Sequence, residues 1–126
     1  MSLVLDTGAL IAFERGDREV AALVEATRRR AERIVTSSGC IAQAWRQGGP
    51  RQALLARLLG GTNEAALDHQ VSRRLGELCA AAGSNDVVDA HVALLARHDD
   101  VLVTSDPKDL GVLLRARGAD VHVHAC

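Results

Sequence analysis

Short apolar runs alternate with longer amphipathic segments along the chain. The first run covers residues 2–5, others stand at 34–36 and 101–104, and a final strand is expected at 120–124. Between them, apolar residues recur at intervals of three or four, which favours helices. Strands separated by helices predict right-handed crossovers and a parallel sheet. We therefore expect an α/β fold in which helices sandwich a parallel sheet, and we expect residues 1–126 to form a single domain.

Capping and helix-breaking residues mark the ends of the expected helices. Asp17 can cap one helix, Pro50 fits the first turn of another, and Gly83 can end a third. The expected helices cover residues 7–13, 18–30, 38–45, 50–59, 69–82, 86–97 and 107–116, with one further short strand near 64–67.

Aspartates follow the first strand and the strand at 101–104. Asp6 comes directly after residues 2–5, and Asp106 comes two residues after the later strand. The carboxyl ends of parallel strands lie at one edge of a sheet, where α/β proteins place their sites. Each aspartate could be only an N-cap, because a helix follows both. Two aspartates at equivalent strand ends favour a shared site over two independent caps.

A second pair of aspartates, Asp86 and Asp89, begins the expected helix 86–97. Residues three apart share a helix face, although acidic residues in a first turn also interact favourably with the helix dipole. Carboxylates brought together repel one another unless a cation lies between them. Hard divalent cations such as Mg²⁺ and Mn²⁺ prefer oxygen ligands. The pattern therefore predicts a divalent-cation site at the edge of the sheet.

Overall charge and composition restrict the possible partners. The net charge is −1 and aromatic residues make up 2% of the chain. A nucleic acid would therefore need a local basic patch, and base stacking would contribute little. The candidate patches are the run 28–30 with Arg33, and Arg46 with Arg51 and Arg57. The sequence shows no apolar stretch of about 18 residues and no signal-like segment, so we expect no membrane span and a cytoplasmic location.

The cysteines and the C-terminal histidines give a weaker signal. The three cysteines are scattered, which disfavours a disulfide framework or a zinc-ligand pair. His122, His124 and Cys126 alternate, so a strand would place them on one face. They could bind a metal there, or they could be the solvent face of an edge strand whose Val121 and Val123 point inward.

Three segments together resemble a PIN domain. They are Leu-Asp-Thr-Gly-Ala-Leu-Ile at 5–11, Asp-Val-Val-Asp-Ala-His-Val-Ala at 86–93, and Val-Thr-Ser-Asp-Pro-Lys-Asp-Leu at 103–110. The chain is most similar to the small single-domain PIN proteins, which include the VapC-type toxins of bacterial toxin–antitoxin pairs. The resemblance implies a PIN-like three-layer fold and a ribonuclease that depends on Mg²⁺ or Mn²⁺. It also implies an RNA substrate, a small antitoxin partner and a homodimer.

The resemblance assigns roles to individual residues. Asp6, Asp89 and Asp106 match acids that hold the metal and are catalytic in the family, and Asp86 is a further metal ligand or a neighbour of the ligands. Asp109 is expected outside the ligand set. The residues expected to support the acids or to contact substrate are Gln43, Thr104, Ser105 and Arg46.

The sequence departs from the family pattern at Gln43, where a glutamate is usual. An amide brings no charge, so weaker metal affinity is expected. A catalytically weak PIN fold that binds RNA or protein is therefore an alternative function. A further alternative is an Asp-dependent phosphohydrolase of the haloacid dehalogenase type or a receiver-like domain. The phosphohydrolase requires an acid at the position of Gly8, and the receiver requires an acidic pair where this chain has Leu5 before Asp6.

Overall fold

The computed structural model describes residues 1–46 and 48–126. Five strands form one sheet in the order β3-β2-β1-β4-β5, and all neighbouring strands are parallel. The strands are β1 (Leu3–Leu5), β2 (Ile34–Ser37), β3 (Asn63–Ala65), β4 (Val101–Thr104) and β5 (His122–Ala125). The predicted parallel α/β architecture is confirmed.

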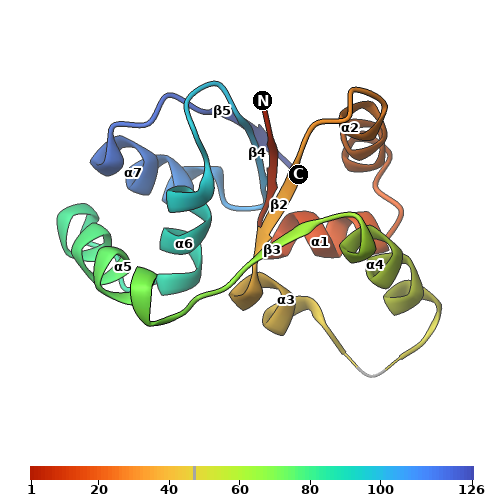
Figure 1. The fold of residues 1–126 in the computed structure, drawn as a ribbon, viewed down its shortest axis with the longest axis horizontal. Coiled ribbons are helices and arrows are strands. Elements are labelled where there is room, and N and C mark those ends of the chain that lie inside the picture. The colour runs from red at the N-terminus through yellow and green to blue at the C-terminus, as the bar shows by residue number, and fades with distance from the viewer. Residues whose placement is uncertain (47) are drawn as a thin grey trace.

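Helices cover both faces of this sheet. Figure 1 shows α5, α6 and α7 on one side and α1, α2 and α4 on the other, which confirms the three-layer prediction. The helices are α1 (Thr7–Glu14), α2 (Arg18–Arg29), α3 (Ser38–Ala44), α4 (Pro50–Gly60), α5 (His69–Ala82), α6 (Val87–Leu95) and α7 (Pro107–Arg117). Within the described residues, none of these helices has the length and apolarity needed to cross a membrane.

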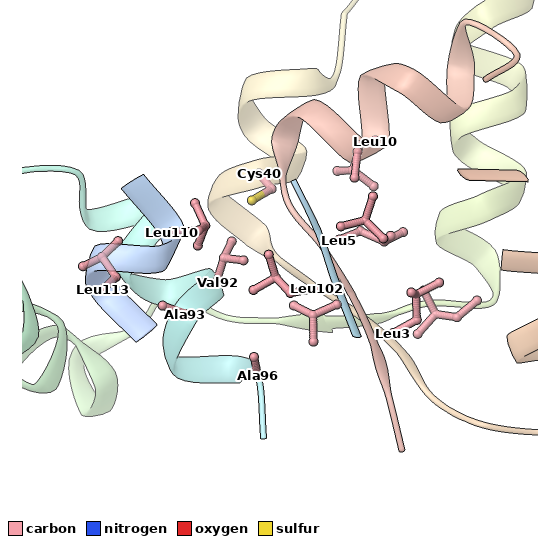
Figure 2. Packing of buried hydrophobic residues seen from close by; sticks show 14 of the residues in the cluster. Leu3, Leu5, Leu10, Cys40, Val92, Ala93, Ala96, Leu102, Leu110 and Leu113 are labelled. Atoms are coloured by element: carbon pink, nitrogen blue, oxygen red, sulfur yellow. The ribbon is translucent and has the colours of Figure 1, made fainter. Parts of the chain in front are cut away.

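The core lies on both faces of the central strands. Leu5 of β1 and Leu102 of β4 are fully buried. Successive side chains of a strand point to opposite faces, and Leu102 is paired with Val4 rather than with Leu5. Figure 2 accordingly shows Leu5 toward Leu10 of α1, and Leu102 toward Val92 of α6. Each such leucine contributes roughly 1.5–3 kcal/mol of burial free energy, so the central strands are held firmly between the helical layers.

Strand pairing explains where the observed bounds differ from the predicted ones. The strand expected at 64–67 is Asn63–Ala65, because its partner β2 ends at Ser37, which lies opposite Ala65. The last strand begins at His122, opposite Val101, where β4 begins. Val123 is 40% exposed, so the expectation that it points inward was wrong. As the sheet edge, β5 has a neighbouring strand on one side only.

Candidate functional site

The carboxyl ends of β1 and β4 bring the predicted aspartates to one edge of the sheet. Leu5 lies opposite Val103 in the sheet, so Asp6 and the loop after Thr104 are neighbours. Carboxylate oxygens of Asp89, Asp106 and Asp109 lie within 4.8 Å of one another. We call these three residues together with Asp6 the carboxylate cluster. All of its donors are carboxylate oxygens, so the residues fit a hard divalent cation.

Asp109 is the member that the sequence analysis placed outside the ligand set. It stands in the first turn of α7, three residues after Asp106. That spacing puts both side chains on one face of the helix, so Asp109 reaches the same space as Asp106. A hydrogen bond with Asp106 and the negative charge of that residue raise the pKa of Asp109, and the charge of Lys108 opposes this rise.

Asp6 is both a helix cap and a buried member of the carboxylate cluster. The residue is only 3% exposed. One of its carboxylate oxygens accepts a hydrogen bond of 2.8 Å from the Ala9 N–H. Burial raises the pKa of Asp6, hydrogen bonds from the Thr104 hydroxyl and the backbone of Ala9 and Ser105 lower it, and the nearby Asp106 raises it again. The same side chain therefore caps α1 and lies near Asp106, while its role in a metal site stays a prediction.

Thr104 connects Asp6 with Asp106. It is fully buried, and its hydroxyl oxygen accepts a hydrogen bond of 2.8 Å from the Asp106 N–H while its hydroxyl bonds the Asp6 carboxylate. Asp106 stands at the N-cap position of α7, but its side chain makes no capping hydrogen bond to the described residues. The Asp106 carboxylate is therefore left to face Asp89 and Asp109, as a ligand would be.

Among the aspartates of the site, Asp89 has the most strongly shifted pKa. Burial, followed by the negative charges of Asp86, Asp6, Asp106 and Asp109, raises its pKa to about 7. Asp86 itself is the N-cap of α6, and its carboxylate accepts a hydrogen bond of 2.9 Å from the Asp89 N–H. Its capping role is thus visible, and its role as a metal ligand stays a prediction.

The two polar residues predicted on and after α3 lie in different surroundings. Gln43 is exposed, and its Oε1 accepts a hydrogen bond of 2.5 Å from the Thr7 hydroxyl, next in the chain to Asp6. Arg46 is also exposed, and its guanidinium donates to the Trp45 carbonyl oxygen at 2.7 Å. Gln43 therefore contacts the residue that follows Asp6, whereas a substrate contact by Arg46 stays a prediction.

A buried histidine supports the site and was not assigned a partner from the sequence. His91 of α6 is 1% exposed, and its Nδ1 lies 2.6 Å from the Ser37 hydroxyl oxygen. That oxygen also accepts the Gly39 N–H, so the hydroxyl proton is available to Nδ1. Burial lowers the pKa of His91, which favours the neutral ring. The contact joins the end of β2, where Ser37 is the N-cap of α3, to the helix that carries Asp89.

Comparison with known proteins identifies the family. The family model described as "PIN domain" matches residues 3–111, which is most of the chain. The chain belongs to the PIN domain family. This assignment disfavours the phosphohydrolase and receiver alternatives. The chain is similar to a solved structure of VapBC2 from Rickettsia felis bound to a DNA fragment from its promoter. The two share 16% sequence identity with a TM-score of 0.69, and the match covers 98% of this chain and 99% of that chain. No curated protein matches.

A hollow of about 570 Å³ adjoins the carboxylate cluster of this PIN domain. Its lining includes Gly8 and Ile11 of α1, the C-cap residue Arg15, and Ser105 from the loop between β4 and α7. Gly8 follows Asp6 by two residues and Ser105 precedes Asp106 directly. Asp17 lines the hollow as well, so the hollow presents one basic and one acidic side chain beside an apolar surface.

We expect Gly8→Ala to disturb the PIN domain at this point. A Cβ on Gly8 would lie 1.9 Å from the Ser105 Oγ and 2.4 Å from its Cβ, so the loop that carries Asp106 must move. Thermal unfolding should show a loss of about 1–3 kcal/mol, as overpacking usually costs. The matched control is Gly76→Ala in α5, where a Cβ meets nothing within 4 Å. There the change should stabilise the helix by roughly 0.5–1 kcal/mol, and equal effects at the two positions would contradict this account.

Proposed function

We propose that this PIN domain is a nuclease that cleaves RNA phosphodiesters with the help of a divalent cation, Mg²⁺ or Mn²⁺. The observation that carries the proposal is the carboxylate cluster, in which acids from three separate segments share one sheet edge. Without a cation such an arrangement is unfavourable, and the negative charges of the neighbouring aspartates add to burial in raising the pKa of Asp89. A site that keeps several acids at that cost is suited to bind a cation.

The residues of the cluster would have different roles. Asp89, Asp106 and Asp109 would hold the cation, and Asp6 would be either a ligand or the acid that fixes the loop of Asp106 through Thr104. A bound divalent cation supplies Lewis-acid stabilisation of negative charge on a phosphate and lowers the pKa of water. Asp89 must lose its proton before it can bind a cation, because only a carboxylate is a good ligand.

The substrate proposal rests on charge and shape around the cluster. Arg15 and Ser105 both line the hollow, and the Arg15 guanidinium could bond a phosphate there. A single strand that crosses the sheet edge would place one phosphate at the acids and a neighbouring nucleotide in the hollow. With aromatics at 2% of the chain, phosphate contacts rather than stacking would provide most of the affinity.

We propose further that the chain is the toxin of a toxin–antitoxin pair, with a small antitoxin as partner. The support is the resemblance of its motifs to VapC-type toxins and a fold shared over almost the whole length with the Rickettsia felis VapBC2 structure. A homodimer belongs to the same proposal. Co-expression with the protein of a neighbouring small gene, followed by size-exclusion chromatography, would test the partner.

A binding module without nuclease activity is the second candidate, and Gln43 favours it. The amide supplies no negative charge, and its Oε1 is occupied by the Thr7 hydroxyl. The cluster therefore lacks the acid that the family motif places there. The same carboxylate edge could then bind RNA through a weakly held cation without cleaving it.

The test is cleavage of a mixed-sequence RNA with Mg²⁺ or Mn²⁺ by the native protein, Asp6→Asn and Gln43→Glu. Asn keeps the capping ability of residue 6 and removes its charge, so folding should be preserved. We expect native cleavage, its loss in Asp6→Asn, and a gain in Gln43→Glu because cation affinity rises. Activity seen only in Gln43→Glu would establish the binding module instead. Full activity in Asp6→Asn would overturn the nuclease proposal at this site.

A further inference from the structure

A second group of metal-ligating side chains lies at the amino ends of β4 and β5. His98 and Asp99 precede β4, whereas Asp120 and His122 stand at the start of β5. The carboxylate cluster is at the opposite, carboxyl ends of the strands. We propose that these four residues form a site for a divalent transition-metal ion of the Zn²⁺ class. The proposal is independent of the nuclease function.

Three of the four residues hold their ligand atoms close together, and the fourth, His122, approaches Asp99. One ligand atom each from His98, Asp99 and Asp120 lies within 4.8 Å of the others. His98 Nε2 is 3.4 Å from one Asp99 oxygen, and His122 Nε2 is 3.9 Å from the other. Both separations exceed an ordinary N–H···O distance. Atoms bound at about 2.0–2.1 Å to a tetrahedral ion are about 3.4 Å apart.

The backbone holds the two loops in place before any ion binds. The Asp99 N–H donates to the Asp120 carbonyl at 2.9 Å, and the His122 N–H donates to the Asp100 carbonyl at 2.9 Å. Asp100 is 2% exposed, and its two carboxylate oxygens accept the Ser2 and Arg97 N–H groups at 2.7 and 2.8 Å. The ligands therefore project from a fixed frame, which lowers the conformational cost of binding.

The chemistry of the donors selects the kind of ion. Two imidazoles and two carboxylates form a mixed nitrogen and oxygen set, which suits Zn²⁺, Co²⁺ or Ni²⁺. Mg²⁺ and Ca²⁺ prefer oxygen donors alone. The preference is thus opposite to that of the carboxylate cluster, and one protein can bind different ions at the two ends of its sheet.

The site would stabilise the edge of the sheet. β5 pairs with β4 alone, and the ion would join the loop before β5 to the loop before β4. His124, which the alternating sequence pattern grouped with His122, instead approaches Glu19 of α2, with its Nε2 at 3.3 Å. The histidine on β5 that can share an ion with Asp99 is therefore His122.

The proposal is tested by titrating the native protein with Zn²⁺ and with Co²⁺ in excess Mg²⁺, which occupies oxygen-donor sites. Calorimetry should give one equivalent of Zn²⁺, and Co²⁺ should produce the visible absorption of a tetrahedral site. The thermal unfolding temperature should rise with Zn²⁺. In the double variant His98→Gln/His122→Gln, Zn²⁺ affinity should fall at least about tenfold. Replacing even a residue that only hydrogen-bonds to a metal ligand usually lowers metal affinity by that factor.

His69→Gln is the matched control, because His69 is an exposed histidine at the start of α5. It should bind Zn²⁺ as the native protein does. The unfolding temperature of the double variant without metal shows whether it is folded. Unchanged Zn²⁺ affinity in a folded double variant, or no Zn²⁺ binding by the native protein, would overturn the site and leave an exposed set of ion pairs. Both outcomes are independent of whether the protein cleaves RNA.

Discussion

Asp106→Asn should reduce cation-dependent RNA cleavage by roughly a hundred- to a thousandfold, the usual cost of removing one group that stabilises developing charge. The Asp106 carboxylate lies with those of Asp89 and Asp109, and it makes no capping hydrogen bond within the described chain. Its removal therefore takes away a ligand and alters the hydrogen bond with Asp109, but it removes no helix cap. The measurement is initial cleavage rate against Mn²⁺ concentration.

Stability should move in the opposite direction, because the substitution relieves repulsion between neighbouring carboxylates. Without metal, Asp106→Asn should unfold at the same temperature as the native protein or above it. Asp100→Asn is the contrasting control, since both oxygens of this buried carboxylate accept backbone N–H groups. That change should cost about 1–3 kcal/mol and leave the cleavage rate of the folded protein intact. A destabilised, still active Asp106→Asn protein would contradict the assigned role.

Without metal, the protein should lose stability as the pH rises from about 4 to about 7. Burial first, and then the neighbouring aspartates, raise the pKa of Asp89 from 3.8 to about 7 in the folded state. Between these values the folded state binds more protons than the unfolded state, so the free energy of unfolding falls with rising pH. The contribution of Asp89 is complete below about 4 and absent above about 7.

Thermal unfolding in a chelator at pH 5 and pH 8, for the native protein and Asp89→Asn, measures this effect. The native protein should lose more stability between the two pH values than the variant, which has no proton to lose. Cation binding should show the complementary behaviour: Mn²⁺ affinity should rise through pH 7, with protons released on binding. Equal pH dependence in the two proteins would show that Asp89 is not the group that titrates.

The sequence by itself determined the order of the elements and the positions of the strand-end acids. Both follow from local information, since the apolar runs fix strands and helices and a parallel sheet brings strand ends to one edge. Asp6 and Asp106 could thus be assigned to one region from the sequence, whereas Asp89, on a helix, was assigned to it through the resemblance of its motif. Asp17 begins α2 and Gly83 ends α5, as expected, because capping depends on neighbouring residues in the chain.

Only the tertiary structure decided which side chains meet. The contact of Gly8 with Ser105, the bond from Thr7 to Gln43 and the pairing of Ser37 with His91 join residues that are far apart in the sequence. The two loops that bring His98 toward Asp120 meet for the same reason, since β5 lies beside β4 in the sheet. Such distances depend on how whole elements pack, and no pattern within one segment contains that information.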